Sequence, residues 1–81
     1  METREENAIA FLRKAYEVAV EHHPESPSSV RINPRELGSR MGLAERTIVE
    51  IVTQLIQSGF AISTLGMHEF MITKLGVATL N

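Results

Sequence analysis

A row of four polar residues is the part of this chain whose residue types and spacing could do chemistry. Arg46, Glu50, Thr53 and Gln57 are four, three and four residues apart, the separations at which side chains share one side of an α-helix. Together they offer charged and neutral hydrogen-bond donors and acceptors. The row could therefore hold a polar partner, or it could be only the solvated side of an amphipathic helix.

Catalysis and metal binding find no support in the residue pattern. His22 and His23 are adjacent and point in different directions on a helix end, and no thiolate or carboxylate completes a zinc site with them and His68. The chain has no Cys, and it contains no nucleophile–base pair, glycine-rich phosphate loop or paired-carboxylate motif. We therefore expect no enzymatic activity, no metal and no cofactor.

The polar row needs a helix that is held in place, and residues 34–58 predict a helix-turn-helix. Asn33 supplies a capping oxygen and Pro34 suits the first helical position. Glu36 is placed so that its carboxylate can accept a hydrogen bond from the backbone N–H of Asn33. The first helix of this pair should run over residues 34–41.

Two glycines fit the junction of that helix pair. Gly42 should form the turn in a left-handed conformation, and Gly38 is small where the two backbones must approach. The next helix should begin near Ala44 and end at Gly59. The apolar anchors of the pair are Leu37, Met41, Leu43, Ile48 and Ile51.

The rest of the chain can be divided by periodicity. Residues 5–22 repeat apolar side chains at helical spacing, residues 24–29 form a Pro- and Ser-rich linker, and residues 30–32 are a short strand candidate. Alternation around Gly66 predicts a β-hairpin over residues 60–73.

Thr73 should cap a final short turn over residues 74–76. A single α+β domain over residues 1–81 follows from these elements. Its predicted core consists of Leu12, Leu37, Met41, Ile48, Ile51, Leu55, Phe60, Ile62 and Ile72.

Composition limits the class of protein. The chain has 81 residues, 43% of them hydrophobic and 22% charged, with a net charge of −2. No apolar run is long enough to cross a bilayer and the acidic start is unlike a targeting segment, so we expect a cytoplasmic protein. Residues 1–30 carry three basic and six acidic side chains, whereas residues 31–81 carry five basic and four acidic ones. Positive charge therefore gathers, thinly, around the predicted helix-turn-helix.

The order helix, short strand, helix, turn, helix, hairpin resembles the winged-helix fold of bacterial and archaeal transcriptional regulators over residues 5–81. Residues 55–60, Leu-Ile-Gln-Ser-Gly-Phe, look like the end of a recognition helix entering the wing. Residues 71–76 are similar to the Leu-Thr-x-x-Gly end of the wing in regulators of the multiple-antibiotic-resistance and related repressor types. The resemblance implies a three-helix core, a short first strand and a C-terminal wing.

The resemblance also implies that the polar row lies in the major groove of double-stranded DNA. Arg46 can hydrogen-bond to a guanine edge, and Gln57 or Gln54 to an adenine edge. Glu50 can accept from a cytosine amino group, and Val49 can contact a thymine methyl group. The expected base contacts are Arg46, Val49, Glu50, Thr53 and Gln57, and the expected phosphate contacts are Arg31, Arg35 and Arg40.

Other residues favour a protein-interaction module that does not bind DNA. Glu45 and Glu50 would repel phosphate, and Ala44 stands where a Ser or Thr cap is usual in such helices. The predicted wing tip lacks Lys and Arg and carries the apolar Leu65 and Met67. Such a module would use the apolar first helix and the wing tip to bind a protein.

A homodimer is expected in either case. The apolar arc of residues 5–22 covers roughly 200°, about twice what a helix packed on one side needs. Val77 and Leu80 can cover one flank of it. The expected dimer interface is therefore Phe11, Tyr16, Val18 and Val20.

Overall fold

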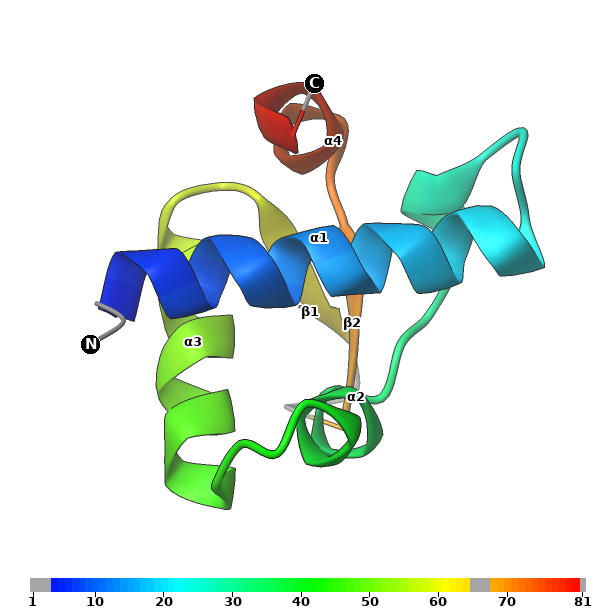
Figure 1. Ribbon diagram of the computed structural model, residues 1–81. Coiled ribbons are helices and arrows are strands. Elements are labelled where there is room, and N and C mark those ends of the chain that lie inside the picture. The colour runs from blue at the N-terminus through cyan, green and yellow to red at the C-terminus, as the bar shows by residue number, and fades with distance from the viewer. Residues whose placement is uncertain (1–3, 65–67, 81) are drawn as a thin grey trace.

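The longest helix, α1 (Arg4–His22), crosses the molecule, and every later helix and the hairpin lie around it (Figure 1). The computed structural model describes residues 4–64 and 68–80. The elements of this part are α1, a short 3₁₀ helix η1 (Pro27–Ser29), α2 (Pro34–Arg40), α3 (Glu45–Gln57), β1 (Ala61–Thr64), β2 (Glu69–Ile72) and α4 (Lys74–Leu80). They make an α+β domain of four α-helices and one two-stranded antiparallel hairpin, counted over those residues. No helix there is long and apolar enough to cross a membrane.

The inner side of α1 is set by small residues. Its buried stripe consists of Ala8, Phe11, Leu12, Ala15 and Ala19. The three alanines carry no side chain beyond Cβ, so they let α1 lie close to the elements on which it packs, α3 and β2 among them. Phe11 is fully buried, and its ring lies 5.7 Å from that of Phe70 with an interplanar angle of 30°. The prediction that Phe11 belongs to a dimer interface was therefore wrong.

The two helices of the predicted helix-turn-helix and the turn between them are confirmed. Asn33 Oδ1 accepts hydrogen bonds from the backbone N–H groups of Arg35 (3.0 Å) and Glu36 (3.3 Å). The carboxylate of Glu36 was expected to accept a hydrogen bond from the backbone N–H of Asn33. Its Oε1 instead accepts one from Arg40 Nη2 at 2.9 Å. The helix ends one residue early, at Arg40, with Met41 as its C-cap.

Gly42 has a φ of +75°, the left-handed conformation that the sequence predicted. The N–H of Leu43 donates back to the carbonyl of Gly38 at 2.9 Å, which closes the turn. Gly38 is buried against α3, where a Cβ would collide with Cγ1 and Cδ1 of Ile48. Gly59, with a φ of +81°, ends the next helix as expected.

The hairpin pairs Ala61 with Ile72 and Thr64 with Glu69. The predicted strand over residues 30–32 is reduced to one bridge, in which Ile32 and Phe70 exchange two backbone hydrogen bonds of 2.9 Å. Ala61 and Ile72 face the core, so the alternation of the strand turns Ile62 outward. Ile62 is 49% exposed, and its predicted place in the core was wrong.

The C-terminal segment is a longer helix than the predicted turn. Thr73 Oγ1 accepts from the N–H of Gly76 at 3.0 Å, which confirms the cap, and donates to the carbonyl of Gly59 at 2.6 Å. One hydroxyl thus joins the start of α4 to the end of α3. Val77 and Leu80 pack against the core, as the sequence predicted for the flank of α1.

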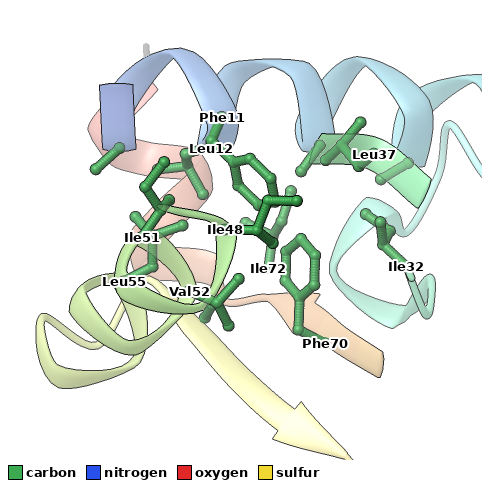
Figure 2. Close-up of a cluster of buried hydrophobic side chains, with 14 residues drawn as sticks. Phe11, Leu12, Ile32, Leu37, Ile48, Ile51, Val52, Leu55, Phe70 and Ile72 are labelled. Atoms are coloured by element: carbon green, nitrogen blue, oxygen red, sulfur yellow. The ribbon is translucent and has the colours of Figure 1, made fainter. Parts of the chain in front are cut away.

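One hydrophobic cluster joins the four α-helices and both strands (Figure 2). Six residues of the predicted core are buried in it, namely Leu12, Leu37, Ile48, Ile51, Leu55 and Ile72. Met41 and Phe60 are partly buried against it. The sequence-based core omitted the two stacked phenylalanines, Phe11 and Phe70, and also Ile32 and Ala61.

Candidate nucleic-acid interface

The polar row of α3 faces away from the core. Arg46, Glu50, Thr53 and Gln57 are all exposed, whereas the opposite side of the helix buries Ile48, Ile51, Val52 and Leu55. A helix with one fixed apolar side and one exposed polar side can present the polar side chains to a partner without rearranging.

Two further residues of α3 flank the row on opposite sides. Val49 is 47% exposed and borders a hollow between α3 and α2. Gln54 is half-buried and lines a different hollow, beside Ala8 and Ile9 of α1. Its amide therefore lies away from the row, and of the two glutamines considered for adenine only Gln57 belongs to the exposed side.

The three arginines expected to hold phosphate do not form one group. Arg31 and Arg40 line one hollow of about 150 Å³, together with Glu36 and His22. Arg35 lines the hollow that borders Val49. Any phosphate contacts would therefore fall on two separate parts of the surface.

Two of these arginines have carboxylate partners. Arg35 Nη2 lies 2.7 Å from Glu45 Oε1, and Arg40 Nη2 lies 2.9 Å from Glu36 Oε1. Both pairs are largely exposed, so each contributes only about 0–1 kcal/mol to stability and can exchange for another partner. The pair of Glu36 and Arg40 is an ordinary i, i+4 contact that sequence spacing could have found. The Arg35–Glu45 pair joins two helices, and no spacing rule predicts it.

The Arg35–Glu45 pair stands at one edge of a hollow of about 260 Å³. Its apolar wall is formed by Pro34, Ile48, Val49 and Val52, and His68, the residue before β2, borders it. The hollow thus brings together residues of α2 and α3 and the residue that precedes β2. His22 lines the other hollow, so His22 and His68 lie apart. Residues 4–64 and 68–80 contain no group of three or more potential metal ligands.

The remaining residues of the expected dimer interface are only half exposed. Tyr16 and Val18 pack against the core, and Val20 is of intermediate exposure. The exposed large apolar side chains in the described ranges are instead Ile9 (37%), Val49 (47%), Ile62 (49%) and Leu75 (55%). Leu65 and Met67, expected at the wing tip, lie outside the described residues.

Comparison of the chain with protein-family models, with curated proteins and with solved structures found no match.

Proposed function

We propose that this chain is a winged-helix protein that binds double-stranded DNA and regulates transcription by occupying a site. The supporting observation is the exposed row of Arg46, Glu50, Thr53 and Gln57 on a helix whose other side is fixed in the core. The order of helices and hairpin is compatible with that fold. An α-helix fits the major groove of B-DNA, where each base pair offers a distinct pattern of donors and acceptors.

In this proposal Arg46 reads a guanine edge and Gln57 an adenine edge, because their side chains make the two-bond contacts those edges favour. Thr53 lies between them and can bond to either kind of base. Glu50 accepts from a cytosine amino group, and Val49, at the rim of the adjoining hollow, meets a thymine methyl group.

The arginines outside the row are proposed to hold phosphates. Arg31 and Arg40 do so from the hollow beside α1, and Arg35 from the opposite part of α2. A phosphate can replace the carboxylate of Glu45 or Glu36, since a surface ion pair contributes little and phosphate is a strong acceptor for arginine. Three such contacts predict a slope of about −3 for log K against log salt.

The first test is a fluorescence titration of labelled mixed-sequence and genomic DNA at low and moderate salt. Binding that weakens with a slope near the value above supports the proposal. If the chain binds no DNA at low salt, where attraction to phosphate is strongest, the proposal is contradicted.

The Arg35–Glu45 pair allows a sharper test. Glu45→Gln removes the carboxylate at 2.7 Å from Arg35 without shortening the side chain. It should strengthen binding to every sequence and increase the salt dependence, because Arg35 becomes available to phosphate. Glu17→Gln, on the exposed side of α1, makes the same change of charge and is the matched control. Equal effects of the two substitutions would mean that only net charge matters.

Specific recognition is tested by two arginine substitutions. Arg46→Ala should cost about 1–3 kcal/mol at one base position and relax the preference there, whereas Arg35→Ala should weaken all sequences alike and reduce the salt slope by about one. Equal and small losses would indicate nonspecific attraction.

A second candidate function is a protein-interaction module. Val49, Ile62 and Leu75 are each about half exposed, and the chain has a net charge of −2. An apolar interface responds weakly to salt, so a partner whose affinity is unchanged between low and moderate salt would favour this function over DNA binding.

A further inference from the structure

The outer side of α1 carries a short pattern that is complementary to itself. Glu6, Ile9, Ala10 and Arg13, all from α1, line one open, shallow surface. They are three, one and three residues apart, so they follow one side of the helix. An acidic residue stands at one end of this stripe, a basic residue at the other, and two apolar residues between them.

We propose that this stripe is an interface between two copies of the chain, with the two α1 helices antiparallel about a two-fold axis. The axis would pass between Ile9 and Ala10. Glu6 of one copy then faces the partner's Arg13, and Arg13 faces the partner's Glu6, so that one pattern makes two ion pairs. The inference concerns a different surface from the polar row of α3 and holds whatever that row binds.

Charge selects the antiparallel arrangement. In a parallel pair Glu6 would face the partner's Glu6, and Arg13 the partner's Arg13, and both contacts would be repulsive. Seven residues separate Glu6 from Arg13, about 10 Å along the helix axis, so the two ion pairs do not crowd each other.

The centre of the stripe suits close packing. Ile9 is 37% exposed, and Ala10 is exposed and small enough to let a second helix approach. Ile9 also lines a hollow of about 240 Å³ with Leu55 and Phe60, so the apolar surface continues from α1 to the end of α3. None of the four residues of the polar row borders this hollow or the stripe.

One helix crossing is a small interface, below the roughly 1,000 Å² of a stable dimer, and the association should therefore be weak. Sedimentation equilibrium of the full chain without DNA, from about 10 µM to 1 mM at low salt, should show a monomer–dimer equilibrium that weakens at high salt. A chain that stays monomeric over this whole range would overturn the proposal. Because DNA is absent, this outcome is independent of the DNA-binding test.

Charge reversal locates the interface. Glu6→Arg or Arg13→Glu alone creates two like-charge contacts and should weaken the dimer by about tenfold or more. The double variant Glu6→Arg/Arg13→Glu restores opposite charges in an antiparallel pair and should recover the dimer. In a parallel dimer the facing charges are alike in the wild type and in all three variants, so single reversals that leave the dissociation constant unchanged would refute the antiparallel arrangement.

Two variants serve as matched controls. Glu21→Arg on the last turns of α1 and Lys74→Glu on α4 make the same changes of charge at exposed positions outside the stripe. They should change the dissociation constant by less than about twofold at moderate salt. Ile9→Asn should weaken the dimer as the charge reversals do. A dimer that responds equally to all these variants, or to none, would show that α1 is not the interface.

Discussion

Gly38→Ala tests how the two helices around the turn are held together. Gly38 is buried in α2, and a Cβ there would overlap with Cγ1 and Cδ1 of Ile48, which is itself 4% exposed. To relieve the overlap, α2 and α3 must separate slightly, or Ile48 must leave its present rotamer and turn toward the hollow that it lines with Val49 and Val52.

The size of the effect follows from two opposing terms. Overpacking of a core costs about 1–3 kcal/mol, and replacing glycine by alanine inside a helix regains up to about 1 kcal/mol. The net loss should be about 1–2 kcal/mol in the free energy of unfolding. For a domain of this size, each kcal/mol lowers the melting temperature by about 4–8 °C.

The assay is urea unfolding followed by circular dichroism, with a double-mutant cycle. Ile48→Val removes Cδ1 and by itself costs about 0.5–1.5 kcal/mol. Combined with Gly38→Ala it should cost at least about 1 kcal/mol less than the sum of the two, because the clash is partly removed. Ser39→Ala, the next and exposed residue of the same helix, should be neutral or slightly stabilising. A Gly38→Ala chain as stable as the wild type, or additive losses in the cycle, would refute this account of the helix junction.

Three other substitutions test separate features of the fold by the same unfolding assay. Gly42→Val should cost about 2 kcal/mol or more from backbone strain alone, because the φ is +75° and no atom lies within 4 Å of the new Cβ; Gly42→Asn should cost clearly less. Ile62→Ser should change the free energy of unfolding by less than about 1 kcal/mol, whereas Ile72→Ser should lower it by several kcal/mol. Equal losses would contradict the orientation of the hairpin, in which Ile72 faces the core and Ile62 faces outward. Thr73→Val should lose about 1–2 kcal/mol and the hydrogen-exchange protection of the Gly76 N–H; unchanged protection would mean that the hydroxyl is not the cap.

Features that depend on a few neighbouring residues could be predicted from the sequence. Asn33 was identified as a helix cap, and Gly42 and Gly59 as left-handed residues, because each requirement is met within one turn of chain. The exposed row of α3 was also predicted, since four inward apolar residues fix the direction of the others.

Features that depend on which surfaces meet were decided only by the tertiary structure. The apolar arc of α1 is wide, so its periodicity does not say which part is buried; packing against Phe70 and α3 placed Phe11 inside and Ile9 outside. The β1 strand begins with a small apolar residue, Ala61, and a large one, Ile62, and only its pairing with β2 turned Ala61 inward and Ile62 outward.

The same distinction between local sequence and tertiary packing applies to the candidate interface. The sequence by itself determined that Arg46, Thr53 and Gln57 share one exposed side of a helix, because helical spacing is a local property. It did not determine that Arg35 meets Glu45 or that Arg31 lies apart from Arg35. Those relations depend on how α2 crosses α3 and on where α1 ends, and such angles come from the packing of many side chains at once.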